Sequence, residues 1–345
     1  MKFFITGGCG FIGTNIALSF NKKNYKDLLI IDNLSKPTAK KNLLLLKKNK
    51  IFFKNIDIAK SKLKIEQLIK KHKPKAIFHL AGQVAMSLSI QNPYNDFHGN
   101  VSSTLNILEA MRKYSKKTVL IYSSTNKVYG DLENYKYSEN KTRFVIKNNF
   151  KGFSEQNRLD FKSPYACSKG SADQYVLDYS RVYGLNTTVF RHSTVYGGRQ
   201  FFTYDQGWIG WFCAQAVKNK LLFKSKFSIS GNGKQVRDIV HIDDIVKLYK
   251  HSIQNFKKIK GKAYNIGGGL NNSFSVIELL NFLESKLKIK LNYYKIKKRP
   301  YDQKVFISNN NKIYKDLKWK PVINYKKGLD QMLEWIKYSK IYKDV

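Results

Sequence analysis

The chain has 345 residues, of which 42% are hydrophobic and 14% aromatic, and its 63 Lys and Arg against 24 Asp and Glu give a formal net charge of +39. This composition excludes an intrinsically disordered protein, and no apolar run approaches the roughly 20 residues that span a bilayer. The three cysteines lie far apart without a C-x-x-C pair, which argues against a disulfide framework and against a metal site, and favours a reducing compartment, the cytoplasm.

The positive charge is spread along the whole chain. Lysine-rich stretches such as 47–55 and 287–299 contain no arginine-rich stripe and no recognised nucleic-acid motif. This pattern favours an ordinary solvated surface over a nucleic-acid site, although the field should attract anionic ligands. We expect neither nucleic acid nor a membrane as a partner.

Short apolar segments alternate with helical patterns from the first residue. Strands are expected at 2–7, 27–32, 51–57, 76–81, 118–124 and 187–192, and helices at 11–23, 60–72, 96–114 and 166–183. This alternation predicts an α/β fold with a Rossmann-type, doubly wound parallel sheet and ligand sites at the carboxyl ends of its strands.

The spacing loosens after about residue 190. A further strand is expected in 263–269 and amphipathic helices at 274–287 and 328–340, while Trp208 and Trp211, three apart on a helix, indicate core packing. We predict a nucleotide-binding domain of residues 1–192 completed by 236–267. A smaller, discontinuous C-terminal region, residues 193–235 and 268–345, would bind the substrate.

The segment FITGGCGFIG, residues 4–13, follows a strand and opens a helix, as a dinucleotide-binding loop requires. Gly7 permits the tight turn, Gly10 lets the backbone approach a pyrophosphate, and Gly13 allows the helix to pack closely on the strand. Asp32 ends the next strand, where a carboxylate accepts hydrogen bonds from the adenine ribose and repels a 2′-phosphate. The glycine loop and Asp32 together favour NAD over NADP.

The segment FKSPYACSKG, residues 161–170, contains a possible acid–base pair. Ser163 and Pro164 are typical of a helix start, which places Tyr165 and Lys169 on one face of that helix. A phenol has a pKa of about 10, and a nearby ammonium, together with a nicotinamide cation, would lower it. The strand that ends in YSSTNKVYG, residues 122–130, offers a hydroxyl. This hydroxyl would bind the substrate oxygen that Tyr165 deprotonates.

The glycine loop, the strand end and the Tyr–Lys pair together resemble the extended short-chain dehydrogenase/reductase proteins that act on nucleotide sugars. The resemblance covers essentially the whole chain. It implies that Thr125, Tyr165 and Lys169 are catalytic and that Arg199, Gln206, Arg237 and Arg299 contact the substrate, with Thr125 also touching it. Because relatives pair through a helical bundle that contains the Tyr–Lys helix, it also implies a homo-oligomer, a dimer or tetramer.

The same resemblance implies a set of cofactor contacts. They are Gly7, Gly10, Phe11, Ile12, Gly13, Asp32, Asn33, Asp57, Ile58, Leu80, Ala81, Gly82, Asn100, Ser123, Tyr165, Lys169 and His192.

The residues after Thr125 bear on the reaction. Dehydratases of this family carry Asp-Glu there, whereas this chain has Asn126 and Lys127, which cannot supply a carboxylic acid and a carboxylate base for losing water. The remaining groups suffice to oxidise a sugar carbinol and reduce the ketone on the opposite face. The surrounding motifs resemble a subgroup that does this at C2 of a CDP-sugar destined for surface polysaccharide. A UDP- or CDP-sugar 4-epimerase and a non-catalytic NAD-binding or nucleic-acid-binding protein stay open as alternatives.

Overall fold

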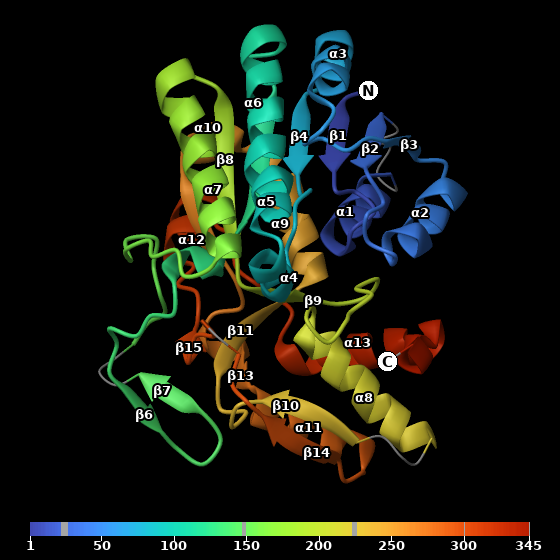
Figure 1. Ribbon diagram of the computed structural model, residues 1–345, viewed down its shortest axis with the longest axis vertical. Helices are drawn as coiled ribbons and strands as arrows, with labels where there is room; N and C mark the ends of the chain where they lie inside the picture. Colours follow the sequence, from blue (N-terminus) through green and yellow to red (C-terminus); the bar gives the residue numbers. More distant parts are fainter. Residues whose placement is uncertain (22–26, 147–149, 223–225, 300, 345) are drawn as a thin grey trace.

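A computed structural model describes residues 1–21, 27–146, 150–222, 226–299 and 301–344 (Figure 1). Its centre is a seven-stranded sheet in the order β12-β8-β5-β4-β1-β2-β3, with every neighbouring pair parallel. The strands are β1 (Phe3–Thr6), β2 (Leu28–Asp32), β3 (Phe52–Asn55), β4 (Ala76–His79), β5 (Val119–Thr125), β8 (Asn186–His192) and β12 (Ala263–Ile266).

Helices cover both faces of this sheet. On one face lie α3 (Lys62–His72), α6 (Ser103–Tyr114) and α7 (Pro164–Tyr183). On the other lie α1 (Phe11–Asn21), α2 (Ala39–Lys48), α9 (Ile242–Gln254), α10 (Phe256–Ile259) and α12 (Asn311–Leu317). The two apolar cores between sheet and helices confirm the predicted doubly wound fold.

The six strands and most of the helices lie where the sequence predicted them. The expected helix 96–114 is interrupted, because α5 (Pro93–Phe97) passes through a wider π-helical turn, η1 (His98–Ser102), before α6 begins. Such turns are common at functional sites, and this one carries Asn100. The end of the expected helix 11–23 lies outside the described residues.

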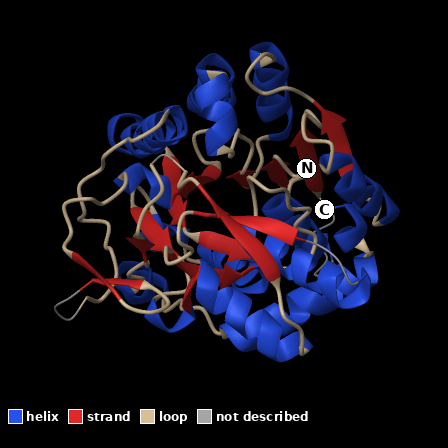
Figure 2. Cartoon of the chain, turned by 60° about the horizontal axis from the view of Figure 1, so that its bottom comes forward, coloured by secondary structure: helices blue, strands red, loops and turns tan. Residues whose placement is uncertain are grey.

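A second group of elements lies at the carboxyl end of the sheet (Figures 1 and 2). It contains a four-stranded sheet of β9 (Thr194–Tyr196), β11 (Val236–His241), β13 (Ser273–Ser275) and β15 (Val305–Phe306), and the parallel pair β10 (Lys226–Ser230) and β14 (Asn292–Ile296). The helices α8 (Trp208–Leu222), α11 (Val276–Leu287) and α13 (Tyr325–Ser339) share a separate apolar core with β9, β10, β11, β13 and β14.

The smaller elements complete the chain. They are α4 (Met86–Gln91), the hairpin β6 (Tyr137–Glu139) and β7 (Phe144–Ile146), and the 3-10 turns η2 (Asn126–Tyr129), η3 (Leu270–Asn272) and η4 (Ile341–Asp344).

Residues 236–267, expected to complete the first domain, divide between the two groups. β12 joins the seven-stranded sheet and α9 packs on its α1 face, but β11 pairs with β9, β13 and β15. The chain therefore passes between the two cores several times, and the exact domain boundaries stay a prediction.

A buried ion pair fixes α7 to the sheet. Arg191 on β8 donates to both carboxylate oxygens of Asp173 on α7, at 2.8 and 2.9 Å, and to the Tyr129 hydroxyl at 3.0 Å. The two charged side chains are only 4% and 0% exposed. Neither charge has water as an alternative partner, so the pair constrains the helix on which Tyr165 lies.

Replacing Asp173 with Ala should lower the free energy of unfolding by about 3–5 kcal/mol, because Arg191 would keep a buried charge without its counterion. Asp178→Ala is the matched control on the same helix, since its partner Arg181 is 80% exposed and such a pair contributes at most about 1 kcal/mol. Urea unfolding of both variants measures the difference. Equal losses would contradict the clamping role of Asp173.

Candidate functional site

The glycine loop lies where the order of the strands reverses. The chain runs from β1 to β2 and β3 on one side, and β4 then joins the other side of β1. Gly7 follows β1 with a φ of +65°, and a Cβ there would lie 2.6 Å from the backbone nitrogen of Ala81, which follows β4. Such a crevice between divergent strands is where doubly wound sheets bind ligands.

The three loop glycines differ in what surrounds them. A Cβ on Gly13 would lie 2.6 Å from the Gly7 oxygen, so α1 packs tightly against the loop. A Cβ on Gly10 would meet only that oxygen, at 3.1 Å, among the described atoms within 4 Å. The open side of Gly10 and the free N–H groups that begin α1 are suited to a pyrophosphate.

Asp32 lies beside this loop at the end of β2. Its carboxylate accepts hydrogen bonds from the backbone nitrogens of Cys9, at 3.0 Å, and Leu34, at 2.9 Å. Burial raises the pKa of Asp32, against the opposing effect of these bonds and of nearby Lys36. Each carboxylate oxygen keeps a free lone pair for a ligand hydroxyl.

The remaining predicted cofactor residues lie along the same edge. Asn33 donates to Asp57 at 3.1 Å, and the Ile58 oxygen accepts from Asn106 at 2.9 Å. Phe11 and Ile12 begin α1, Leu80, Ala81 and Gly82 follow β4, and Ser123 lies near the end of β5.

Two polar atoms of predicted cofactor residues are buried without a partner in the described part of the chain. They are Oδ1 of Asn100 and Nδ1 of His192. Nδ2 of Asn100 donates to Ser168 at 2.9 Å, and Nε2 of His192 lies 3.1 Å from the Tyr249 hydroxyl. Buried polar atoms are rarely left unpaired, so both atoms fit a site completed by a ligand.

Thr125 and Tyr165 lie together at the bottom of a pocket. Thr125 ends β5, and Tyr165 lies in the first turn of α7, which Ser163 caps by accepting from Ala166 at 3.1 Å. Burial raises the pKa of Tyr165 to about 12, although a hydrogen bond with Thr125 opposes the rise.

Lys169 contacts different groups from those the sequence suggested. Its ammonium donates to the Ser123 oxygen and lies 4.3 Å from the centre of the Tyr122 ring. Burial lowers the pKa of Lys169 to about 7, against the charges of Asp173 and Asp96. Burial is the largest effect on the pKa of Tyr165 in the protein alone, so the lowering expected from Lys169 together with a nicotinamide cation stays a prediction.

The pocket has a volume of about 290 Å³ and is formed by both groups of elements. Besides Thr125 and Tyr165 it is lined by Arg237 and Arg299, two of the predicted substrate contacts. The other two face the N-terminal half: Arg199 donates to Asn15 at 2.7 Å, and Gln206 accepts from Lys36 at 3.2 Å.

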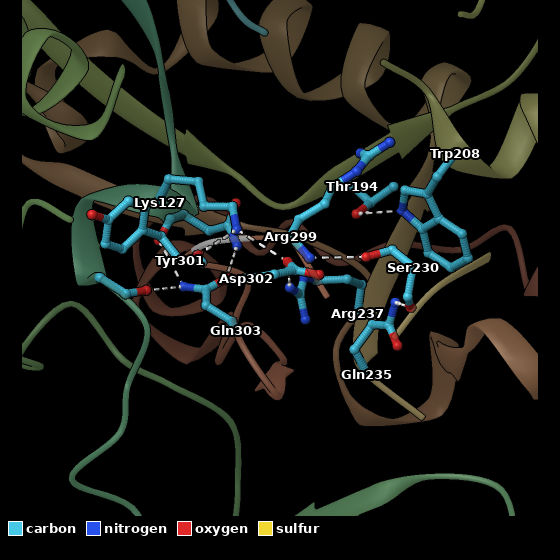
Figure 3. Close-up of polar contacts among 12 residues, drawn as sticks. Lys127, Thr194, Trp208, Ser230, Gln235, Arg237, Arg299, Tyr301, Asp302 and Gln303 are labelled. Carbon is cyan, nitrogen blue, oxygen red and sulfur yellow. Dashed lines mark hydrogen bonds and ion pairs between the residues drawn. The ribbon is translucent and has the colours of Figure 1, made fainter. Parts of the chain in front are cut away.

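Charged side chains converge on Asp302 in the pocket wall (Figure 3). Arg237 and Lys127 both contact its Oδ1, Lys127 at 3.4 Å. Burial alone would raise the pKa of Asp302, but these two cations outweigh it and lower the pKa. Burial also lowers the pKa of Lys127 to about 8, which Asp302 opposes.

Arg299 also lines this pocket. It donates to the Tyr204 oxygen at 3.0 Å, pairs with Asp205 at 3.2 Å, and stacks 4.7 Å from the centre of the Tyr204 ring. Its side chain is 35% exposed, so phosphate oxygens can reach the guanidinium.

Sequence reasoning missed several pocket residues. Trp208 and Trp211 pack against the second apolar core as expected, but both also line the pocket, and the Trp208 nitrogen donates to Thr194 at 3.5 Å. Asp302 also lines it, and Gln303 lies behind it on Asn126. One signal in the sequence could have pointed to Asp302 and Gln303: this polar pair begins three positions after the predicted contact Arg299.

The described residues contain neither a metal-binding cluster nor a membrane-spanning helix. No three His, Cys, Asp or Glu side chains among them are grouped as a metal site would require. None of the helices they form combines the length and apolarity needed to cross a membrane.

Known proteins resemble the chain along nearly its whole length. The profile of the family described as GDP-mannose 4,6 dehydratase matches residues 4–332. A CDP-paratose 2-epimerase from Salmonella typhi is 51% identical over 336 residues, which cover 97% of this chain and 99% of the relative. A crystal structure of UDP-glucose 4-epimerase with UDP-glucose, from Thermotoga maritima, has a TM-score of 0.83 at 26% identity and covers 99% of this chain and 100% of that one.

A second solved structure shares the fold. It is UDP-glucuronic acid 4-epimerase from Bacillus cereus in complex with UDP-glucuronic acid and NAD, with a TM-score of 0.83, 23% identity, and coverage of 98% of this chain and 100% of that one. These findings confirm the resemblance to the extended short-chain dehydrogenase/reductase proteins that act on nucleotide sugars. The chain belongs to the GDP-mannose 4,6 dehydratase family.

Proposed function

We propose that this protein is an NAD-dependent epimerase that converts CDP-paratose to CDP-tyvelose, by transient oxidation at C2 and reduction on the opposite face. The observation that carries the proposal is a pocket in which Thr125 and Tyr165 face the substrate while Asn126 and Lys127 replace the acids of a dehydratase. The 51% identity to a CDP-paratose 2-epimerase supports the choice of sugar. The product would serve surface polysaccharide (O-antigen) synthesis.

The residues at the sheet edge fit NAD. The open side of Gly10 accommodates the pyrophosphate, and Asp32 suits the two ribose hydroxyls. The buried, unpaired Oδ1 of Asn100 and Nδ1 of His192 would form hydrogen bonds with polar groups of the cofactor. NAD held by these residues would supply both the hydride acceptor and the hydride donor, so no co-substrate would be needed.

Tyr165 removes the proton from the C2 hydroxyl and later returns it to the ketone oxygen. Because burial holds its pKa near 12 in the protein alone, the phenol needs added positive charge beside it to become a base at neutral pH. Lys169 lies one turn along α7, within the same buried site, and Thr125 holds the reacting oxygen in place. Inversion then requires only that the ketosugar turn before reduction.

Elimination of water lacks its acid and base. Asn126 has no titratable proton, and Lys127 is held against Asp302 in the pocket wall. The two positions therefore stabilise the pocket instead of protonating a leaving hydroxyl. This argument separates the proposal from the dehydratase reaction that gives the family its name.

Arg237 and Arg299 both line the pocket and would hold the substrate's diphosphate there. The Tyr204 ring packs against the Arg299 guanidinium and helps to hold it in place, and the planar fork of the guanidinium suits a contact with phosphate oxygens. A UDP- or CDP-sugar 4-epimerase would use the same groups, and the substrate panel below distinguishes it.

A second copy of the chain is the proposed partner at the α5–α7 face. Tyr94 and Phe97 are exposed there beside an apolar cavity of about 480 Å³, and Tyr175 and Val182 are exposed further along α7. Exposed apolar side chains gathered on one face are typical of an interface.

Asp32→Ala should weaken NAD binding roughly 10- to 100-fold, because two charge-assisted hydrogen bonds are lost. Binding of NADP should weaken less or improve, since Lys36 would face the 2′-phosphate without a competing carboxylate. Calorimetric titration of cofactor-free protein measures both. Asp27→Ala, directly before the same strand and with a side chain 47% exposed, is the control, and unchanged NAD affinity in Asp32→Ala would contradict the ribose role.

Tyr165→Phe should reduce turnover by about 10²- to 10⁴-fold while the protein still retains NAD, because only the acid–base group is removed. Tyr338→Phe, at a tyrosine that is 90% exposed on α13, should keep full activity. Turnover is followed by NMR of the sugar protons. Full activity in Tyr165→Phe would overturn the mechanism.

A panel of CDP- and UDP-sugars tests the substrate. CDP-paratose should equilibrate with CDP-tyvelose, visible in the C1 and C2 proton signals, while UDP-glucose stays unchanged. Inversion of a UDP-hexose at C4 with CDP-paratose untouched would establish the alternative. Salt-sensitive retention on DNA with no turnover of any sugar would favour the non-catalytic alternative.

A further inference from the structure

A buried carboxylate lies between α5 and α7, behind the predicted cofactor residue Asn100. Asp96 is only 1% exposed, and its Oδ1 accepts from Nε2 of Gln83 at 2.9 Å while its Oδ2 accepts from the Ser168 hydroxyl. Burial raises the pKa of Asp96, against the hydrogen bonds from Ser168 and Gln83 and the charge of Lys169. Donors that converge on both oxygens favour the ionised form, so Asp96 serves its neighbours as a hydrogen-bond acceptor.

The neighbours of Asn100 fix the orientation of its amide. One amide atom lies 3.2 Å from the backbone oxygen of Gln83, which can only accept, so this atom is the donor Nδ2. The same Nδ2 lies 2.9 Å from Oγ of Ser168. The Ser168 hydrogen faces only acceptors, the carboxylate of Asp96 and the backbone oxygen of Tyr165 at 3.2 Å, so Oγ accepts from Asn100. A directed chain of hydrogen bonds therefore runs from Asn100 through Ser168 to Asp96.

The amide oxygen of Asn100 is left on the opposite side. This Oδ1 is buried and has no hydrogen-bond partner among the described residues. A Cβ built on Gly82, directly after β4 and its following residues, would lie 2.3 Å from it, so a side chain at this position would cover the oxygen. Buried acceptors are rarely left unpaired, and the glycine keeps this one accessible. The position therefore suits a ligand group that donates a hydrogen bond.

The order of the strands indicates which half of the dinucleotide supplies that donor. β1 lies between β2, which ends at Asp32, and β4, which precedes Gly82. Asp32 is the predicted partner of the adenine ribose, so the adenine half belongs on the β2 side of β1. Asn100 lies beside Gly82 on the β4 side, toward β5 and Thr125. The nicotinamide half must lie on this side for the hydride to reach a sugar bound at Thr125.

We propose that Asp96 and Ser168 are positioning residues for the cofactor: they hold the Asn100 amide so that its oxygen accepts a hydrogen bond from the nicotinamide-ribose half of NAD. The donor is a hydroxyl of that ribose or the NH₂ of the carboxamide. Phosphate oxygens only accept, so the pyrophosphate is not the partner of this oxygen. The inference rests on the proposed NAD-dependent function and adds to it two residues that do not touch the cofactor.

The experiment compares the affinities of cofactor-free protein for NAD and for ADP by calorimetric titration. Ser168→Ala removes the hydroxyl that accepts from Asn100, so NAD should bind about 3- to 10-fold more weakly, the effect of one hydrogen bond lost. ADP lacks the nicotinamide half and should bind as tightly as it does to the unmodified protein. ADP-ribose distinguishes the two donors, because weaker binding assigns the ribose hydroxyl and unchanged binding assigns the carboxamide.

Further variants separate positioning from a merely structural effect. Asp96→Ala removes the last acceptor of the chain and should weaken NAD binding by a similar factor while leaving ADP binding unchanged. Asn100→Ala removes the contact itself, so adding Ser168→Ala to it should cause no further loss of NAD affinity. Ser180→Ala is the matched control, because this serine is 9% exposed and lies about three turns further along α7, and it should keep the NAD affinity.

The positioning role and the proposed function fail in different ways. If the unmodified protein binds no NAD, the proposed function fails. If it binds NAD but Ser168→Ala and Asp96→Ala bind it equally well, only the positioning role fails. Equal weakening of NAD and ADP would show a merely structural effect and would also overturn the inference. So would an additive loss of NAD affinity when Ser168→Ala is combined with Asn100→Ala, because Ser168 would then not act through Asn100.

Discussion

The active pocket depends on how α7 is held against the sheet. Asp173 lies two turns after Tyr165 on this helix, and its buried pair with Arg191 ties the helix to β8, the neighbour of the strand that ends in Thr125. Tyr129 and Asn265 extend the same polar connection to η2 and β12. Because both charges are shielded from water, the helix cannot slide without leaving one of them unpaired. The distance between Thr125 and Tyr165 is thus set by groups that do not touch the substrate.

Burial gives this site its second property, which is that the two proposed catalytic side chains tend toward their neutral forms. Removing Tyr165 from water raises its pKa to about 12, and removing Lys169 lowers its pKa to about 7, so both tend toward their neutral forms. A reactive phenolate would form only when cofactor and sugar fill the pocket, which suits an enzyme that must take back the hydride it removes.

Local signals in the sequence were enough for the first half of the molecule. Alternating strands and helices predicted the sheet, and the spacing of Gly7, Gly10 and Gly13 predicted the loop, because backbone freedom is a property of single residues. Tyr165 and Lys169 followed from helical spacing. The chain could not reveal that Lys169 would donate to Ser123, since that contact depends on how α7 packs.

The substrate side could not be read in the same way. β11 pairs with strands from distant segments, and the partners of Asn126 and Lys127 lie more than 170 residues away at Gln303 and Asp302. Trp208 and Trp211 have the spacing of core residues, and only the tertiary structure shows that they line a pocket. Residues that act through such long-range contacts carry no local pattern.

The central claim is that one carbon is oxidised and reduced with the same hydride. Conversion of CDP-paratose deuterated at C2, followed by mass spectrometry and NMR, tests it most directly. We expect CDP-tyvelose to keep the deuterium at C2, with none lost to solvent over many turnovers. Loss of the label to water would show that the C2 hydrogen leaves as a proton and would contradict the proposed mechanism.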